Sequence, residues 1–369
     1  MRQEPDAFLR GFRFDYHEVC CQLTCISEGV SSMSKGRTEG PWSFSIALSG
    51  ARIGEPDDGP SLPVVPRHIV ELFQKDGFVV FPSVLPGSLI NSLNDRLEEI
   101  LRGRYDRGSK PDKTPKILKT RYRGRQVEES KCGERGGTRG KPKGTVGALG
   151  FSGNYENVRV LQVINVHKAD YLFRQLAVSP ALGKLVADLA GWKQGTRLAQ
   201  DQIWAKPPHA PPLTFHRDSP YFMFDPDDVV TVWVALDDMD AEIGPLQYVK
   251  GSHLWGDGRI GSASQFFDIN GHSLLQSAAD LEGIKDYEIV SMAGLLAGGL
   301  SVHNGRTWHG SARNSSTVRP RRGLGLHFVP AEVKFTSAAK KSSLWRRYVN
   351  DHPHSGQLPD DDFPVTWHP

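Results

Sequence analysis

The sequence has few cysteines and no apolar segment long enough to cross a bilayer. Its four cysteines, three of them clustered at Cys20, Cys21 and Cys25, are too few for a disulfide framework, which favours a reducing compartment. Unpaired thiols are a better interpretation of the cluster than a metal site, because no second Cys or His pair follows at finger spacing. The first residues lack the apolar core of a secretory signal. We therefore expect a cytoplasmic protein with no membrane partner.

The chain also has little net charge, +3 at pH 7, so its charge gives no reason to expect a nucleic-acid partner. Residues 102–143 nevertheless carry fifteen Lys or Arg against five Asp or Glu. The Gly and Pro scattered through this stretch predict a loop rather than a basic helix. A solvated surface loop is the favoured interpretation, and a clamp for a phosphate, a CoA tail or nucleic acid stays open. Binding of single-stranded nucleic acid is disfavoured, because the stretch has only two aromatic residues, Tyr105 and Tyr122, on which bases could stack.

Glycine and proline are abundant, with 38 and 25 residues, which suits a chain of many strands and turns. Helical spacing of apolar residues predicts helices that start near Pro66, at Ser88 and at Ser179-Pro180, with the two serines as caps. The predicted strands are 78–85, 159–166, 200–206, 229–236, 246–249, 300–303 and 323–329. Helices first and strands later predict a mostly β domain with some α, an antiparallel sandwich or barrel with N-terminal helices packed outside.

The chain divides into three parts on this pattern. Residues 1–64 are irregular and are expected to form a flexible N-terminal arm. Residues 65–335 make one domain, in which 102–150 is a basic loop insertion, and residues 336–369 form a C-terminal extension. We therefore expect the chemistry to lie within 65–335.

The segment Thr214-Phe215-His216-Arg217-Asp218 is the first candidate for chemistry. If it is extended, His216 and Asp218 point to the same face and can converge on one metal ion. Two histidines and one carboxylate on one face of an octahedron leave open positions for a bidentate 2-oxo acid and dioxygen. The His-Arg-Asp of a protein kinase is rejected, because no Asp-Phe-Gly and no Gly-rich nucleotide loop accompany it.

The third ligand must come from farther along the chain. His303 and His309 are the candidates, and Arg319, Arg321 and Arg322 follow them. A bound 2-oxo diacid needs a cation for its far carboxylate, and a guanidinium binds a carboxylate through two hydrogen bonds. The residues alone leave the choice of histidine and of arginine open.

The chain resembles the phytanoyl-CoA dioxygenase (PhyH) family from about Pro66 to Pro330. Four groups of residues carry the resemblance: Phe73-x3-Gly77-Phe78-Val79-Val80-Phe81; Lys206-Pro207-Pro208 with His216-Arg217-Asp218-x2-Tyr221; Trp233-x2-Leu236 with Gly244-Pro245-Leu246 and Gly251-Ser252-His253; and His309-Gly310-Ser311-x2-Asn314 with Arg321 and His327-Phe328. Lys250 stands where the family has the proline of a Pro-Gly-Ser-His turn. The resemblance implies a double-stranded β-helix, also called a jelly roll or cupin-like fold.

The resemblance also implies the residues of the site. The metal ligands fall on His216, Asp218 and His309. The partners of the 2-oxoglutarate carboxylate fall on Arg321 and Ser311, although one extra residue before the arginine keeps Arg319 and Arg322 as alternatives. Trp233 matches a residue that lines the co-substrate site, and Gln202 is expected to reach the same pocket. Halogenating relatives have Gly or Ala in place of the carboxylate that Asp218 provides, so hydroxylation is expected.

The expected function is an Fe(II)- and 2-oxoglutarate-dependent dioxygenase. It would use O2 to hydroxylate a small organic substrate, such as an acyl-CoA or a natural product, and release succinate and CO2. Two alternatives remain. One is a Zn(II) hydrolase or lyase on the same three ligands, and the other is a non-catalytic β-sandwich binding protein.

Overall fold

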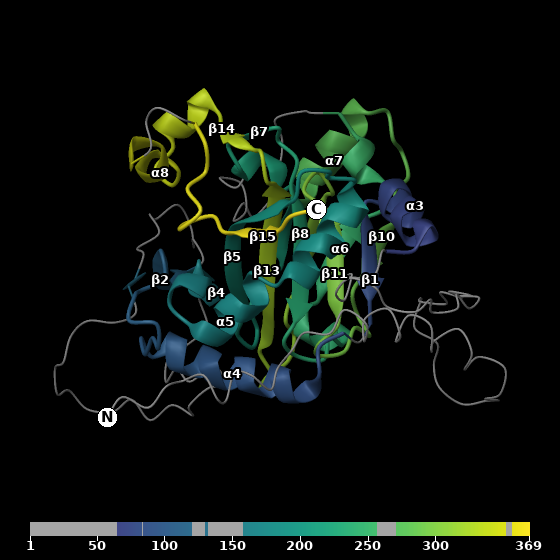
Figure 1. Ribbon diagram of the computed structural model, residues 1–369. Helices are drawn as coiled ribbons and strands as arrows, with labels where there is room; N and C mark the ends of the chain where they lie inside the picture. The colour runs from purple at the N-terminus through teal and green to yellow at the C-terminus, as the bar shows by residue number, and fades with distance from the viewer. Residues whose placement is uncertain (1–64, 83, 120–129, 132–157, 257–270, 352–355) are drawn as a thin grey trace, which may run out of the picture.

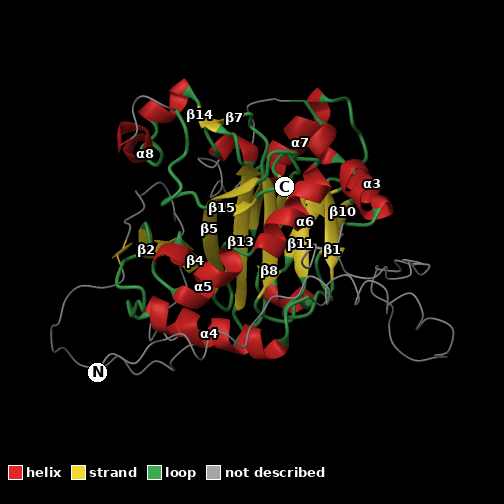
Figure 2. Ribbon diagram, in the orientation of Figure 1, coloured by secondary structure: helices red, strands yellow, loops and turns green. Residues whose placement is uncertain are grey.

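The fold is known from a computed structural model, which describes residues 65–369 apart from 83, 120–129, 132–157, 257–270 and 352–355. The predicted N-terminal arm and most of the predicted basic insertion therefore lie outside the described residues. Figures 1 and 2 show a tall antiparallel sheet at the centre of the molecule with helices around it. A second, smaller sheet completes the β structure that carries the site.

The large sheet contains nine strands. They are β1 (Phe78–Phe81), β2 (Lys113–Lys119), β3 (Ser130–Lys131), β4 (Val158–Ile164), β5 (Thr196–Lys206), β8 (Val230–Ala235), β11 (Leu300–Asn304), β13 (Arg321–Pro330) and β15 (Val365–Trp367). Their order is β1-β11-β8-β13-β5-β4-β2-β3, and β15 pairs with β5. Strand β13 lies between β8 and β5, so strands from distant parts of the sequence share one surface.

The small sheet has the order β10-β9-β12-β6, and a two-stranded sheet pairs β14 with β7. The bounds are β6 (Leu213–His216), β7 (Phe224–Asp225), β9 (Leu246–Val249), β10 (Ile289–Ser291), β12 (His309–Ser311) and β14 (Lys334–Phe335). All pairings in the three sheets are antiparallel. This arrangement is the predicted jelly roll, and β12 is a strand that the sequence pattern did not predict.

Several helices pack on one face of the large sheet, and the helix formed by Gly271–Leu281 packs against the small sheet instead. Figure 1 shows α5 and α6 in front of the sheet and α4 across its lower end. The helices are α3 (Arg67–Asp76), α4 (Gly87–Leu101), α5 (Tyr171–Ala177), α6 (Pro180–Ala190), α7 (Gly271–Leu281) and α8 (Arg346–Asp351). The 3-10 turns are η2 (Val166–Lys168), η3 (Ser219–Tyr221), η4 (Ala241–Ile243), η5 (Ser252–Leu254) and η7 (Ser337–Lys341). The apolar faces of α4 and α6 join the main core, as their helical spacing predicts.

The two predicted helix caps are wrong in detail. Helix α4 begins one residue before Ser88, with Pro86 at its N-cap and no capping hydrogen bond from a side chain. Ser179 does occupy the N-cap position of α6, but its side chain does not cap the helix. In each case proline, whose φ angle is already near the helical value, sits at the start of the helix.

Two other segments differ from the sequence pattern. The prediction of a loop over 102–143 is wrong for Lys113–Lys119, which form β2 and extend the sheet from β4. Past residue 336, Trp345, Tyr348 and Phe363 form an aromatic cluster with Phe222 and Phe224. The C-terminal residues therefore pack against the segment that follows Asp218.

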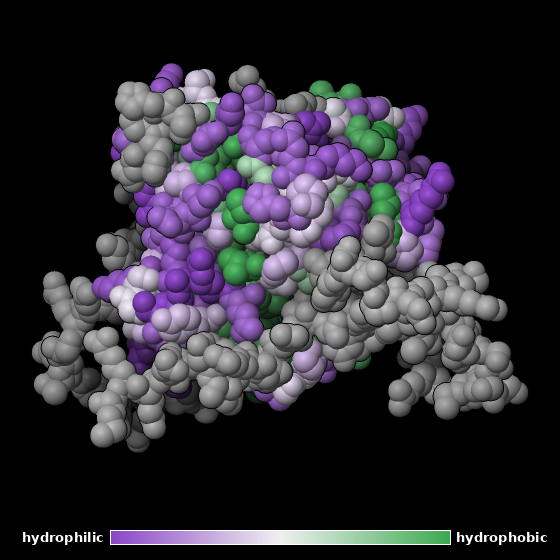
Figure 3. Space-filling view, viewed as in Figure 1, coloured by the Kyte–Doolittle hydropathy of each residue, from purple (hydrophilic) through white to green (hydrophobic). Residues whose placement is uncertain are grey.

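On the face shown in Figure 3 the hydrophilic side chains dominate, and the apolar ones are scattered rather than gathered in one patch. Among the described residues, we find no helix with the length and apolar character needed to span a membrane.

Candidate metal centre and co-substrate pocket

The small sheet brings His216, Asp218 and His309 together. His216 ends β6, His309 begins β12, and the two residues are direct partners in the pairing of those strands. The Nε2 atoms of His216 and His309 lie 3.8 and 3.7 Å from Oδ1 of Asp218. One ligand atom from each residue lies within 4.8 Å of the others, and all three side chains are buried. Two ligands that are each about 2.1 Å from one ion are separated by roughly 3 to 4 Å, so this spacing suits a metal ion.

Asp218 reaches the cluster by a different local geometry from the one predicted. Strand β6 ends at His216, and Asp218 has φ −77° and ψ −42° as the first residue before the 3-10 turn η3. The expected alternation of an extended strand is therefore wrong at this residue. A tight turn after the strand brings the carboxylate back toward the histidines.

Backbone carbonyls orient both imidazole rings. His216 Nδ1 lies 2.9 Å from the carbonyl oxygen of Thr214, and His309 Nδ1 lies 2.9 Å from that of Thr307. A carbonyl only accepts, so each Nδ1 donates and each Nε2 presents a lone pair toward Asp218. Burial lowers the pKa of both histidines to about 4, which keeps them neutral at pH 7 and able to bind a metal.

Two side chains from the large sheet hold the other oxygen of Asp218. Thr231 Oγ1 on β8 donates to Oδ2 at 2.7 Å, and His303 Nε2 on β11 donates to the same atom at 3.1 Å. Oδ1 is left facing His216 and His309. Burial by itself would raise the pKa of Asp218, but the neighbouring His309 and His303 hold it well below its usual range. The carboxylate is therefore ionised and fixed in orientation before any metal arrives.

His303, the competitor of His309 in the sequence, thus contacts the carboxylate rather than completing the three-residue cluster. Its other nitrogen, Nδ1, lies 3.2 Å from the hydroxyl of Tyr248, which also contacts Ser301. The sequence signal that could have found His303 and Thr231 is their position on strands whose neighbours are apolar. A buried polar residue in such a strand needs a partner.

Two buried cations lie side by side, and one of them, Arg321, lines the same cavity as His216, Asp218 and His309. Arg321 and Lys206 are direct partners in the pairing of β13 with β5, and they are 1% and 0% exposed. Arg321 donates to Ser311 Oγ at 3.4 Å, and Lys206 Nζ donates to the same oxygen at 3.2 Å and to the carbonyl of Ala312. Among the described residues neither cation has a carboxylate within ion-pair distance, and Arg321 Nε has no hydrogen-bond partner. Such a pair can hold an anion.

The three candidate arginines have different surroundings. Arg319 is exposed and pairs with Asp240 and Glu242, and Arg322 pairs with Asp237. Arg321 lines the cavity instead. Burial lowers the pKa of Arg321 to about 10, so its guanidinium still carries a charge at pH 7.

The burial of Lys206 has a larger effect on its charge. Burial first, and then the neighbouring Arg321, lower its pKa well below the usual value. A bound anion would favour the charged form. Sequence reasoning gave Lys206 no role, although a lysine among the apolar residues of a strand is the signal that could have found it.

Trp233 and Gln202, two of the predicted site residues, line the cavity. The guanidinium of Arg321 lies 5.8 Å from the ring centroid of Trp233. Gly323 makes this packing possible, because a Cβ atom there would lie 2.2 Å from the Trp233 ring. The Gln202 side chain is engaged by other amides: Gln162 Nε2 donates to it at 2.8 Å, and it donates to Gln200.

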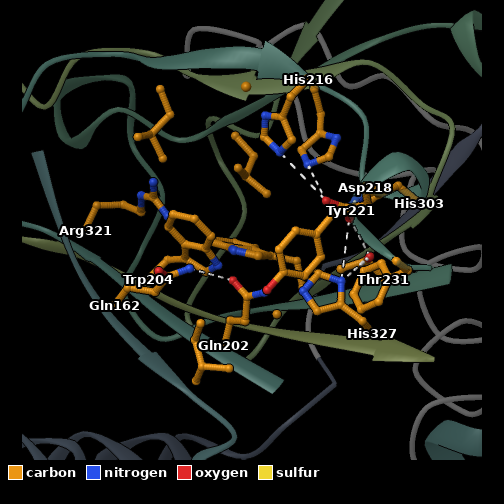
Figure 4. Close-up of a pocket in the computed structure, with 18 of the residues that line it drawn as sticks. Gln162, Gln202, Trp204, His216, Asp218, Tyr221, Thr231, His303, Arg321 and His327 are labelled. Carbon is orange, nitrogen blue, oxygen red and sulfur yellow. Dashed lines mark hydrogen bonds and ion pairs between the residues drawn. The ribbon is translucent and has the colours of Figure 1, made fainter. Parts of the chain in front are cut away.

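Residues of both sheets therefore enclose one cavity. The lining includes Leu213, His216, Leu246 and His309 from the small sheet and Gln202, Thr231, Trp233, His303, Arg321 and His327 from the large one. Figure 4 shows Arg321 on the left of this cavity and Asp218 with its histidines on the right, with Gln162 and Gln202 below. The His-Asp-His cluster and Arg321, one member of the buried cation pair, thus face one space.

The chain is similar in sequence to known 2-oxoglutarate-dependent oxygenases. The model of the family described as phytanoyl-CoA dioxygenase (PhyH) matches residues 73–323. A probable alpha-ketoglutarate-dependent hypophosphite dioxygenase of Stutzerimonas stutzeri is 30% identical over 142 residues, which are 38% of this chain and 47% of that protein. A phytanoyl-CoA dioxygenase of Arabidopsis thaliana is 25% identical over 190 residues, or 50% and 63% of the two chains. This chain spans about half the length of the curated relatives it matches.

Solved structures share the fold. The non-heme alpha ketoglutarate dependent carbocyclase SnoK from nogalamycin biosynthesis has a TM-score of 0.54 and 20% identity, covering 78% of this chain and 94% of its own. The epimerase SnoN from the same biosynthesis has a TM-score of 0.53 and 19% identity, covering 81% and 97%. The match over residues 73–323 shows that this chain belongs to the phytanoyl-CoA dioxygenase (PhyH) family of Fe(II)- and 2-oxoglutarate-dependent oxygenases.

Proposed function

We propose that this protein, with Fe(II) as its cofactor, hydroxylates a small organic molecule in a reaction that consumes O2 and 2-oxoglutarate and releases succinate and CO2. The observation that carries the proposal is the pairing of two features in one cavity. A buried His-Asp-His cluster faces the space into which Arg321 points without a carboxylate partner among the described residues. A metal ion would fill the space between the three ligands, and the carboxylate of a bound dicarboxylate would pair with Arg321.

In this proposal His216, Asp218 and His309 hold the iron. Two neutral imidazoles and one carboxylate on one side of an ion are the donor set of the non-heme Fe(II) oxygenases. Thr231 and His303 fix the ligand Asp218 through its second oxygen, which keeps Oδ1 directed at the metal position. The protein thereby sets the geometry of the site in advance.

Arg321, Lys206 and Ser311 hold the far carboxylate of 2-oxoglutarate. The guanidinium has an unpaired Nε and the ammonium has no counter-charge among the described residues, so a carboxylate between them would satisfy both. Trp233, against the guanidinium, forms an apolar wall of this site, and Gln202 lies on the same cavity. The keto-acid end of the molecule would then extend toward the histidines.

The bound metal and its co-substrate supply the oxidising power that replaces a substrate C–H bond by C–OH as 2-oxoglutarate loses CO2. The chain's own residues bind, orient and exclude water. Phe222 and Trp233 are buried on the cavity wall, which limits solvent at the reacting carbon. Because Asp218 keeps its carboxylate, the site has no vacated position for a halide, which supports hydroxylation. An acyl-CoA or a natural product is the proposed substrate class.

The Zn(II) hydrolase and the binding-protein alternatives explain less of the cavity. Either could use the three buried ligands, but neither gives a role to Arg321 and Lys206. Keeping two buried cationic side chains that have no counter-ion among the described residues is unfavourable unless an anion joins them. The anion site therefore favours the oxygenase.

The proposal is tested by titrating 2-oxoglutarate into the anaerobic Fe(II) protein and following the visible absorption of the chelate. Wild type should develop a saturable band that His309→Ala lacks. Arg321→Met should need at least about 30-fold more 2-oxoglutarate, since it breaks a buried charge pair. Arg322→Met is the matched control, because Arg322 pairs with Asp237. Equal titrations for the two arginine variants, or no band in wild type, would overturn the proposal.

A further inference from the structure

His327 stands on the same face of β13 as Arg321. Residues two apart in a strand share a face, and Arg321, Gly325 and His327 of β13 all line the cavity. His327 is paired with Thr231 of β8 on one side and is 6% exposed. Its ring lines the cavity beside Asp218, as Figure 4 shows.

The hydrogen bonds around Thr231 fix which nitrogen of His327 carries the proton. Thr231 has one hydroxyl proton, and Asp218 Oδ2, 2.7 Å away, can only accept it. The Thr231 oxygen therefore accepts the second bond of 2.8 Å, which His327 Nδ1 must donate. In a neutral ring Nε2 then presents a lone pair and no proton.

That lone pair has no hydrogen-bond partner among the described residues, although the nitrogen is buried. The space in front of it is kept open by Gly325, where a Cβ atom would lie 3.6 Å from Nε2. A buried acceptor without a partner is unfavourable, so its retention in a cavity points to a ligand that donates to it.

The rest of the wall points to a neutral ligand. Two amides of the wall, Gln162 and Gln202, are joined by a hydrogen bond, and Gln202 donates in turn to Gln200 behind it. Of the charged groups on the described lining, the proposed function assigns Asp218 to the metal and Arg321 to 2-oxoglutarate. The third, Lys113, is exposed and already interacts within the protein. On the described lining a cationic substrate would find no free counter-charge, whereas a hydroxyl or an amide would find hydrogen-bond partners.

We propose that His327 Nε2 accepts a hydrogen bond from a hydroxyl or N–H group of a neutral substrate, close to the carbon that is oxidised. This rests on the proposed function for the reaction itself. It makes His327 a specificity-determining residue, because an analogue without the donor would leave Nε2 unpaired again.

Nitrogen-15 NMR of histidine-labelled full chain, loaded with diamagnetic Zn(II) and 2-oxoglutarate, tests the inference without turnover. His327→Gln assigns the His327 signals by their loss. The probes are propan-2-ol and acetone, which are nearly equal in size but differ in the donor. We expect His327 to be protonated at Nδ1 alone. Propan-2-ol should then shift the Nε2 signal upfield to saturation while acetone does not.

Gly325→Ala supplies the control, because its methyl group would crowd Nε2 at an ordinary contact distance. It should keep the Nδ1-protonated form and reduce the response to propan-2-ol. A proton on Nε2, equal shifts with both probes, or no shift with either would overturn the inference. A negative Fe(II) titration would overturn the proposed reaction but would not change the NMR result for His327, so the two proposals can fail separately.

Discussion

Replacing Lys206 with methionine should raise the stability of the protein without ligands and weaken its binding of 2-oxoglutarate. The two effects have opposite signs because the buried ammonium group lowers stability when no anion is bound and strengthens binding when an anion is present. Without an anion, Lys206 is fully buried beside Arg321, and no described carboxylate pairs with it. With the anion bound, it becomes half of a charge pair.

The magnitudes follow from its contacts. Removing the buried ammonium eliminates a desolvation penalty of several kcal/mol. Against this, the hydrogen bonds to Ser311 and Ala312 are lost, which costs about 1–3 kcal/mol. Methionine has a similar length, so the free energy of unfolding should rise by about 1–3 kcal/mol. Loss of one charge-assisted hydrogen bond to the carboxylate, about 1.5–3 kcal/mol, should raise the Kd of 2-oxoglutarate about ten- to hundredfold.

Urea unfolding of the ligand-free protein measures the first effect, and calorimetric titration of the Zn(II) protein with 2-oxoglutarate measures the second. Arg319→Met is the control: it also removes a nearby cation, but one that is exposed and paired with Asp240 and Glu242. It should change stability by about 0.5 kcal/mol or less and leave the Kd unchanged. If Lys206→Met destabilises the protein and leaves the Kd unchanged, the lysine is structural and the reasoning fails.

Three further predictions follow from the site. Thr231→Val should weaken metal binding about ten- to hundredfold, because the carboxylate ligand loses a fixed partner; unchanged competition with a chromophoric chelator would contradict this. Gly323→Ala should lower the free energy of unfolding by about 1–3 kcal/mol, since its Cβ would overlap Trp233, whereas Gly325→Ala should be tolerated; equal urea midpoints would oppose it. The metal-free protein should lose stability as the pH falls from about 6.5 toward 4, by about 1.4 kcal/mol per unit for each histidine whose pKa burial lowers to about 4. The unfolded chain binds protons there that the folded chain does not, and a flat pH profile would refute this.

The sequence predicted the parts of the fold that local patterns control. The apolar spacing of α4 and the short β runs of β5, β8 and β13 correspond to elements of the structure. The loop predicted at 113–119 is wrong because β2 gains its partners from β4, which is distant in sequence. Long-range pairing of this kind has no local signature.

The candidate site shows the same division. His216, Asp218 and His309 could be proposed from residue types and spacing, and the structure places them in one cluster. The residues around Asp218 could not be predicted from the sequence, because Thr231 and its neighbours belong to the large sheet and contact Asp218 only in the folded protein. The proposed role of Lys206 could not be predicted either, since it depends on the strand pairing that places Lys206 opposite Arg321. The register between strands that are distant in the sequence could not be predicted from local patterns.

The most direct test of the proposed function is the release of succinate from 2-oxoglutarate by the purified, Fe(II)-reconstituted protein without added substrate. The proposal predicts slow, Fe(II)- and O2-dependent formation of succinate and CO2 in equal amounts, lost in His216→Ala. Succinate formation that His216→Ala retains, or its absence in a wild-type protein that also shows no spectral response of Fe(II) to 2-oxoglutarate, would contradict it.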